Sequence, residues 1–147
     1  MYKKILVALE NSAADESLIL HVTELAKRLE SELLLLHVAD GFAARNFNQL
    51  KLAESEEIKA DRAYLEVVAE KFREQKLTTA TQLAMGEPSK EILKAAEKEK
   101  CDLIAMGSHG HRLIGDIVFG STIHQVRHHT RIPVLLVRAG QKKDSST

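Results

Sequence analysis

The sequence predicts a doubly wound α/β sandwich, in which helices cover both faces of a parallel sheet. Short apolar segments alternate with longer amphipathic ones along the 147 residues. Several of the short segments are apolar almost throughout, which is typical of parallel strands covered on both faces. This alternation favours parallel strands joined by right-handed crossovers. A chain of this length fits one domain, and we expect that domain to span residues 1–140.

Five of the short apolar segments are the expected strands, and they lie at residues 4–9, 32–38, 78–83, 103–106 and 133–137. The last strand opens with Pro133, which has no backbone N–H donor and therefore suits an edge of the sheet. An apolar edge strand that no charge protects is open to pairing with another chain. We therefore expect the last strand to lie at an edge and to be available for assembly.

The amphipathic segments are the expected helices, at about residues 12–30, 50–75, 89–98 and 121–129. In the first of them, Leu18, Val22 and Leu25 recur at helical spacing, and the second carries a similar stripe. Pro88 is placed to open the third. We expect residues 40–48 to form a loop near the sheet edge and the polar residues 141–147 to form a disordered tail.

Composition excludes several classes of protein. Twenty-one basic residues balance twenty-one acidic ones, so no general field favours nucleic acid or a membrane surface. The longest apolar run is far shorter than the ~20 residues that cross a bilayer, and the first residues lack the longer apolar core of a secretory signal. The single Cys101 excludes an internal disulfide framework. We expect a soluble, cytoplasmic protein with no membrane insertion and no nucleic-acid partner.

Four of the seven glycines fall within fourteen residues, at positions 107, 110, 115 and 120. This run follows the fourth expected strand and leads into the last helix. In doubly wound sheets, ligands bind outside the carboxyl ends of the strands, where the strand order reverses. Glycine lets backbone N–H groups come close to a ligand, and such groups at the start of a helix can cradle a phosphate. The glycine run is therefore the candidate site.

The two halves of the run have separate physical interpretations. Gly107 and Gly110 would present N–H groups to a phosphate chain that passes over the strand end. Gly120, Ser121 and Thr122 would begin the last helix, whose unpaired amides and partial positive charge favour an anion. The two hydroxyls would bond that anion or cap the helix. The alternative is that the glycines only permit a tight connection from strand to helix.

Residues 115–122 imitate a phosphate-binding P-loop, with the pattern Gly-x-x-x-x-Gly-Ser-Thr. Serine stands where the P-loop has the lysine that contacts the β- and γ-phosphates. The preceding expected strand ends nine residues before this pattern begins. We exclude a P-loop for these two reasons.

The glycine run also resembles a family motif, Gly-x-x-Gly, nine residues, then Gly-Ser or Gly-Thr. Here the motif consists of Gly107 and Gly110, the spacer 111–119, and Gly120-Ser121. Together with the apolar segments at residues 4–8 and 132–137, it makes the chain similar to the universal stress protein family, in its nucleotide-binding branch. The resemblance implies an adenine-nucleotide α-hydrolase-like fold with the strand order 3-2-1-4-5.

The resemblance further implies an adenine nucleotide as ligand, which is ATP, ADP or AMP, with or without Mg²⁺. The implied nucleotide-binding residues lie at strand ends and in the motif, and they are Ala8, Leu9, Glu10, Val38, Met106, Gly107, His109, Gly110, Gly120, Ser121 and Thr122. Val38 would line the adenine slot. Glu10 stands where the family has an aspartate, and its carboxylate would hold a ribose hydroxyl or the Mg²⁺. The alternative is a solvent-facing Glu10, with Asn11 or Ser12 capping the first helix.

Five of the seven histidines lie between residues 109 and 129, which raises the question of a metal site. His124 and His128 have a spacing that can chelate zinc, but the glutamate of the His-Glu-x-x-His pattern is missing. We expect these histidines to face solvent or phosphate, and His37 to be a hydrogen-bonded core residue. Acidic residues beside Cys101 would raise the pKa of its thiol, which argues against a reactive thiolate.

The leading functional hypothesis is a nucleotide-responsive regulator in the stress response with little or no turnover, because phosphate-binding groups are plentiful and no base for activating water is evident. A slow ATPase or self-phosphorylating enzyme is the second, with Ser121 or Thr122 as acceptor and Glu10 or Asp116 holding metal. The third is a nucleotide-free dimer that acts through protein contacts, for example on a transporter. The resemblance implies a two-fold homodimer through residues 134–137; no residue identifies a regulatory protein partner.

Overall fold

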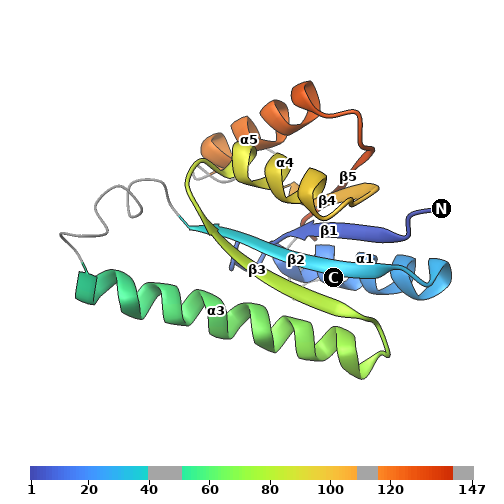
Figure 1. Cartoon of the computed structure of the whole chain (residues 1–147), viewed down its shortest axis with the longest axis horizontal. Helices are drawn as coiled ribbons and strands as arrows, with labels where there is room; N and C mark the ends of the chain where they lie inside the picture. The colour runs from blue at the N-terminus through green and yellow to red at the C-terminus, as the bar shows by residue number, and fades with distance from the viewer. Residues whose placement is uncertain (40–50, 109–115, 141–147) are drawn as a thin grey trace, which may run out of the picture.

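A computed structural model of the chain describes residues 1–39, 51–108 and 116–140 (Figure 1). Its strands are β1 (Lys4–Ala8), β2 (Glu32–Ala39), β3 (Thr79–Met85), β4 (Leu103–Ser108) and β5 (Val134–Arg138). Its helices are α1 (Asp15–Leu29), α3 (Lys51–Glu74), α4 (Pro88–Lys98) and α5 (Asp116–His129). None of these described helices is both long and apolar enough to cross a membrane. The expected loop at 40–48 and the expected tail at 141–147 lie outside the described residues.

The sheet is parallel throughout, with the strand order β3-β2-β1-β4-β5 (Figure 1). This confirms the predicted fold class and the order that the family resemblance implied. β5 pairs with β4 alone among the described strands, so it is the expected edge strand. The chain moves outward from β1 to β3 on one side and from β4 to β5 on the other, so the order reverses between β1 and β4. Ligands of doubly wound sheets bind at such a reversal.

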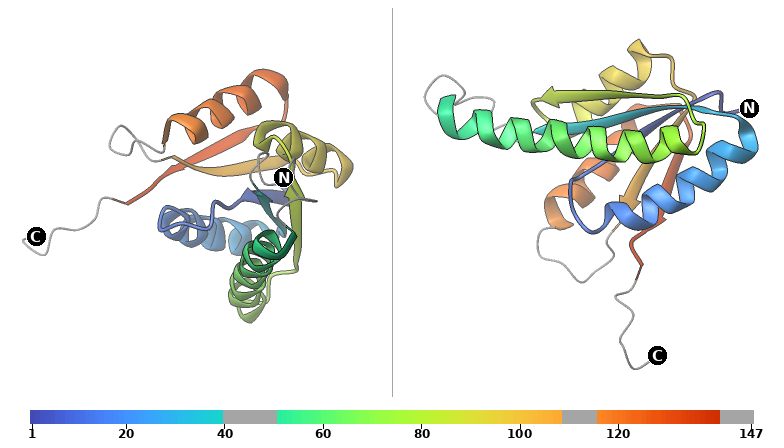
Figure 2. Two further views of the ribbon diagram at one scale, coloured as in Figure 1. Left: turned by 90° about the vertical axis from the view of Figure 1, so that its left-hand side faces the viewer. Right: turned by 90° about the horizontal axis from the view of Figure 1, so that it is seen from below.

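Two helices cover each face of the sheet. Ile5 and Val7 of β1 pack in a cluster with α1 and α3, whereas Leu6 and Ala8 pack in a second cluster with α4 and α5. Figures 1 and 2 show these two pairs of helices on opposite sides of the sheet. Both sets of β1 side chains are buried, and each fully buried large aliphatic side chain contributes roughly 1.5–3 kcal/mol. Burial on both faces is the reason why β1 is apolar throughout.

The last helix begins earlier than predicted. α5 starts at Asp116, five residues before the expected start, so Gly120, Ser121 and Thr122 lie in its second turn. The unpaired N–H groups of a helix belong to its first four residues, and the prediction that residues 120–122 supply them is therefore wrong. A helix interior tolerates glycine at a cost of roughly 1 kcal/mol relative to alanine. Gly120 therefore lies inside α5 and does not mark its start.

The fourth strand runs further than predicted. β4 extends to Ser108, so Gly107 lies inside the strand and pairs in register with Val137 of β5. Gly86 is the one glycine in the described ranges with a positive φ. Gly107 therefore adopts backbone angles open to any residue, and its φ gives no reason for glycine at this position.

Candidate functional site

The carboxyl ends of β1, β2 and β4 lie side by side where the strand order reverses. Ala8 pairs in register with Leu36 of β2 and with Met106 of β4. The backbone N–H of Leu9 then continues the ladder by donating to the carbonyl oxygen of Leu36 at 2.8 Å. Because the strands are parallel, their ends form one edge. The predicted site residues that this edge brings together are Ala8, Leu9, Val38, Met106 and Gly107.

β2 projects beyond its neighbour at this edge. Its last register pair with β1 is at Leu36, and the strand continues for three residues to Ala39. Val38 lies on this extension, where it pairs with Ala84 of β3 on the other side. The half-buried Val38 side chain packs against the cluster shared with α4 and α5. The backbone of Val38 on the β1 side is therefore not covered by β1.

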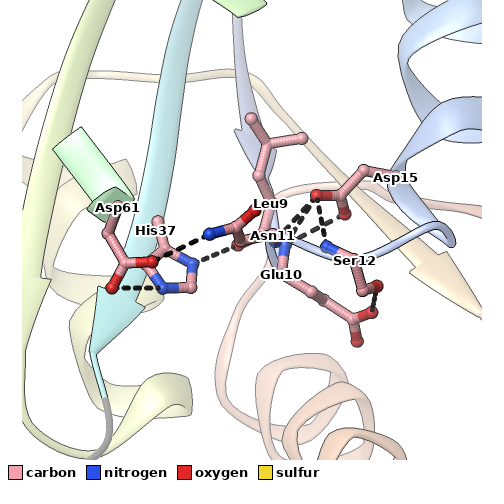
Figure 3. A network of polar contacts seen from close by, with 7 residues as sticks. All are labelled: Leu9, Glu10, Asn11, Ser12, Asp15, His37 and Asp61. Atoms are coloured by element: carbon pink, nitrogen blue, oxygen red, sulfur yellow. Dashed lines mark hydrogen bonds and ion pairs between the residues drawn. The ribbon is translucent and has the colours of Figure 1, made fainter. Parts of the chain in front are cut away.

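The turn from β1 to α1, residues 10–12, is held by the carboxylate of Asp15. Its oxygens accept hydrogen bonds from the backbone N–H groups of Glu10 at 2.9 Å and Asn11 at 2.8 Å (Figure 3). Asp15 is buried, and Tyr64 of α3 donates its hydroxyl to the same carboxylate at 2.5 Å. Burial, followed by the hydrogen bond to Asp15, raises the pKa of Tyr64. The hydroxyl therefore stays protonated and remains a donor.

The cap named in the alternative interpretation of Glu10 is not formed. The N-cap residue is Ala14, which makes no side-chain capping bond, so neither Asn11 nor Ser12 caps α1. Asn11 instead adopts a left-handed φ of 63°, which asparagine tolerates better than most residues. The hydroxyl of Ser12 donates to Oε2 of Glu10 at 3.0 Å. This bond orients the Glu10 carboxylate, which is the predicted ribose or Mg²⁺ ligand.

The second half of the glycine motif lies on α5. Gly120 and Ser121 are exposed, whereas Thr122 is buried. A Cβ atom placed at Gly120 would meet no atom within 4 Å. Packing within the described chain thus gives no reason for glycine at this position. His109 and Gly110 lie outside the described residues.

The histidines of α5 form no metal centre with other described residues. His124 and His128 are exposed, as expected, and their rings meet edge to face with centroids 4.3 Å apart. Nδ1 of His129 lies 2.8 Å from the carbonyl oxygen of Gln125 in its own helix. Among the side chains that the structure describes, in residues 1–39, 56–108 and 120–140, no group of three or more His, Cys, Asp or Glu could hold a metal ion. Glu10 as a Mg²⁺ ligand stays a prediction.

His37 links the end of β2 to β1 and to α3. Its Nδ1 lies 2.8 Å from the carbonyl oxygen of Leu9, and its Nε2 lies 3.4 Å from Oδ2 of Asp61. The side chain is 12 % exposed, which confirms the prediction of a hydrogen-bonded core histidine. The other carboxylate oxygen of Asp61 accepts a hydrogen bond from the side-chain amide of Asn11 at 3.0 Å (Figure 3).

Sequence reasoning missed Asp15, Asp61 and Tyr64. Asp61 lies 50 residues from Asn11, and Tyr64 lies 49 residues from Asp15, so no local pattern joins these partners. One signal was available in the helix itself. Asp61 falls on the same stripe as Leu65 and Val68, at positions i, i+4 and i+7, where a charged residue is unexpected. A buried acid on an apolar stripe must find donors elsewhere in the fold.

Comparison with known proteins assigns the family. A profile of the universal stress protein family matches residues 1–138. The chain belongs to the universal stress protein family. The universal stress protein MJ0577 of Methanocaldococcus jannaschii is 31 % identical over 158 residues, which cover 94 % of this chain and 96 % of that protein. YxiE of Bacillus subtilis is 30 % identical over 148 residues, which cover 94 % of this chain and all of YxiE.

Solved structures of universal stress proteins share the fold. The structure of MJ0577, described as a structure-based assignment of biochemical function, matches with a TM-score of 0.81 at 28 % identity, covering 97 % of this chain and 99 % of that one. The universal stress protein from Archaeoglobus fulgidus in complex with dAMP matches with a TM-score of 0.70 at 21 % identity, covering 93 % and 98 %. The second match shows the fold alone.

Proposed function

We propose that this universal stress protein binds an adenine nucleotide, which is ATP, ADP or AMP, and acts as a nucleotide-responsive regulator in the stress response. The observation that carries the proposal is the Gly-x-x-Gly, nine-residue, Gly-Ser motif, which starts at the end of β4 beside the reversal of strand order. The Archaeoglobus fulgidus protein solved with dAMP gives the ligand class by analogy. We also propose that the protein acts in the cytoplasm.

The base and ribose would bind at the ends of β1 and β2. β2 projects three residues beyond its last pair with β1, which leaves backbone groups near Val38 for the edge of an adenine. Ala8 and Leu9 would form the floor beside it, and Met106 the neighbouring strand end. The Glu10 carboxylate, oriented by its bond with Ser12, would hold a ribose hydroxyl or a Mg²⁺ ion; bound Mg²⁺ would neutralise phosphate charge.

The phosphates would lie against the glycine motif. Gly107 and Gly110, with His109, would flank the phosphate chain on the strand side, and Gly120 and Ser121 on the α5 side. The buried Thr122 would support the helix beside them. Gly120 is the residue that supports this arrangement best. It lowers helix stability by roughly 1 kcal/mol relative to alanine, although a Cβ there would meet nothing within 4 Å. Close approach of a ligand is a physical reason to keep glycine at such a position.

Self-phosphorylation is the second candidate function, and the burial of the two hydroxyls distinguishes between its possible acceptor residues. Ser121 is exposed, whereas Thr122 is buried. A hydroxyl must reach the γ-phosphate to act as a nucleophile. Ser121 is therefore the acceptor in this alternative, and phosphate incorporation from ATP in Ser121→Ala compared with the unaltered protein tests it.

A homodimer through residues 134–137 is part of the proposal. β5 is an edge strand, and Leu136 on it is 40 % exposed. Beside it, an open groove of about 590 Å³ is lined by α1 residues, including the 65 % exposed Leu20, and by Val137 of β5. Unpaired strand edges and exposed apolar side chains are features of assembly surfaces.

Thermal denaturation with nucleotides tests the binding proposal. A ligand at ~100 times its dissociation constant adds roughly 2.7 kcal/mol to the free energy of unfolding. For a domain of this size, we expect a rise in Tm of about 5–10 °C. Millimolar ATP with Mg²⁺ should produce this rise, and GTP a smaller one. No rise with ATP, together with no nucleotide released by acid from the freshly purified protein, would reject the proposal.

A further inference from the structure

The two parts of the proposed nucleotide site, the β1–α1 turn and the end of β2, are joined through a side chain of α3. Asp61 is 8 % exposed and uses both carboxylate oxygens. Oδ1 accepts a hydrogen bond from the Asn11 amide at 3.0 Å, and Oδ2 lies 3.4 Å from Nε2 of His37. Figure 3 shows Asp61 facing both residues. One carboxylate therefore ties the turn to the strand end.

Through the two residues that it contacts, Asp61 holds the backbone on either side of Glu10. A carbonyl oxygen only accepts hydrogen bonds, so His37 must carry a hydrogen on Nδ1 to bond the carbonyl of Leu9 at 2.8 Å. A carboxylate also only accepts, so His37 forms the ion pair with Asp61 when Nε2 carries a hydrogen as well. Asp61 thus fastens Leu9 through His37 and fastens Asn11 directly. The N–H of Glu10 itself is held by Asp15. The direction of the Glu10 side chain follows from these restraints on its backbone.

A second contact from the same helix supports the turn. Tyr64, three residues after Asp61 and on the same face of α3, donates its hydroxyl to Asp15 at 2.5 Å. Asp15 in turn accepts the backbone N–H groups of Glu10 and Asn11. Helix α3 therefore holds the turn at two points, one through Asp61 and one through Tyr64.

We infer that Asp61 is a positioning residue of the nucleotide site, which sets Glu10 and the end of β2 in their binding arrangement before the nucleotide arrives. The inference rests on the proposed function. Groups that are already ordered lose less freedom on binding, and the ligand is bound more tightly as a result. Asp61 touches no nucleotide in this scheme and acts through Asn11 and His37.

Two substitutions at Asp61 separate positioning from folding. In Asp61→Asn, the amide oxygen accepts from Asn11 and the amide nitrogen donates to Nε2 of a neutral His37 ring, so both contacts are kept without the ion pair. Asp61→Leu has a similar size but removes both links. It leaves the Asn11 amide and Nε2 of His37 without this partner, which lowers stability. Glu70→Leu is the control, because it changes an exposed acid of α3 to leucine away from the turn.

Calorimetric titration with MgATP gives the first readout. We expect Asp61→Leu to weaken binding about tenfold, with a lowered Tm but a cooperative unfolding transition that shows a folded protein, and Asp61→Asn and Glu70→Leu to bind as the unaltered protein does. The second readout is the ¹H–¹⁵N spectrum without nucleotide. The amide signals of residues 10–12 should shift in Asp61→Leu and not in Glu70→Leu.

The outcomes distinguish this inference from the proposed function. If the unaltered protein binds no MgATP, both fail. If it binds and Asp61→Leu binds equally well, the inference alone is overturned. Weaker binding with unchanged amide signals at residues 10–12 also overturns it, because the loss would then arise elsewhere, and so does an equal loss in Asp61→Asn, because the two links would then not be what matters.

Discussion

Acidic side chains hold the backbone at both ends of β1. Asp15 binds the turn at the carboxyl end, and Asp102 accepts the backbone N–H groups of Lys3 at 2.9 Å and Lys4 at 3.0 Å at the amino end. Burial acts to raise the pKa of Asp102, but the two backbone hydrogen bonds outweigh it and lower the pKa. Hydrogen bonds to the charged form favour that form. Asp102 therefore contributes to stability as a carboxylate.

Asp102→Asn should reduce stability at neutral pH and lose its effect in acid. Because the folded pKa is lowered, the contribution of Asp102 is present above the ordinary carboxyl pKa and is lost as pH falls through the folded value. We expect a difference in the free energy of unfolding of less than about 1 kcal/mol, because the carboxylate is partly exposed. Urea unfolding at pH 7 and pH 3 measures it; a difference that grows in acid would contradict the account.

Cys101 makes a contribution to stability that is lost at alkaline pH, whereas that of Asp102 is lost in acid. Burial, which is the largest cause, raises the pKa of the thiol to about 11, and the charge of the nearby Lys4 acts in the opposite direction. The folded state keeps the proton longer, so this stability contribution is full below the ordinary thiol pKa and is lost as pH rises towards 11.

Thiolate absorbance near 240 nm of the folded protein measures the Cys101 titration directly. We expect the difference in absorbance between the unaltered protein and Cys101→Ala, which removes the tyrosinate absorbance at this wavelength, to rise with a midpoint at about 11. Urea unfolding should show that the loss of stability between pH 9 and pH 11 is smaller in Cys101→Ala than in the unaltered protein. A midpoint at the value of a free thiol would mean that the buried environment does not act on the thiol.

Gly120 weakens helix α5, although packing within the described chain does not require glycine there. Gly120 lies in the second turn, and a Cβ atom there would meet nothing within 4 Å. At Gly86, in contrast, the backbone itself favours glycine, because its positive φ of 140° is one that other residues rarely adopt. The two glycines therefore differ in what alanine should do to stability and, under the proposed function, to binding.

Gly120→Ala should stabilise the fold by up to about 1 kcal/mol and weaken ATP binding, because the new methyl group occupies the proposed phosphate path. Gly86→Ala should destabilise the fold and leave the affinity for ATP unchanged, which makes it the control. Urea unfolding and calorimetric titration measure the two quantities. Unchanged ATP affinity in a stabilised Gly120→Ala would remove Gly120 from the phosphate site.

At the scale of the whole molecule, β5 connects the proposed site to the proposed dimer. It pairs with β4 through Gly107 and Val137, and its other edge is unpaired among the described strands. Leu135 and Val137 pack against the α1 and α3 cluster, whereas Leu136 is 40 % exposed. Leu136 is therefore the position on β5 where a charge can be introduced with little change to the core.

Leu136→Lys should convert the proposed dimer to a monomer, because a charge would be buried between two copies of β5. Light scattering at micromolar concentration measures the mass, and an unchanged Tm of the dilute protein shows that the fold is kept. If the unaltered protein is monomeric under these conditions, the proposed dimer is refuted. If Leu136→Lys is still dimeric, the interface lies elsewhere.

Nucleotide binding should favour dimer formation, and the reverse, if α5 couples the nucleotide site to the dimer interface. The helix runs from beside the proposed phosphate groups to residue 129, five residues before β5. A coupling of ~1–3 kcal/mol would raise the association constant roughly 5- to 150-fold in the presence of ATP. Sedimentation velocity over a dilution series, with and without ATP, measures the constant; superimposable curves would mean that the two events are independent.

The sequence by itself determined the class, number and order of the elements that the structure describes. Apolar residues that recur every three or four positions indicate a buried helix face, and an uninterrupted apolar run indicates a buried strand. Both patterns are local in the sequence. The edge position of β5 followed from Pro133. The helix start at Asp116 was missed because Gly120 has a propensity that tertiary contacts can override.

Only the tertiary structure decided how the candidate site is built. Leu9 and Asn11 are linked to His37 and Asp61, at separations of 28 and 50 residues along the chain. Such contacts depend on the register of β1 against β2 and on how α3 packs across them, and neither is written in a local pattern. Asp61 interrupts an apolar stripe in the sequence, and the fold supplies the donors that make its burial possible.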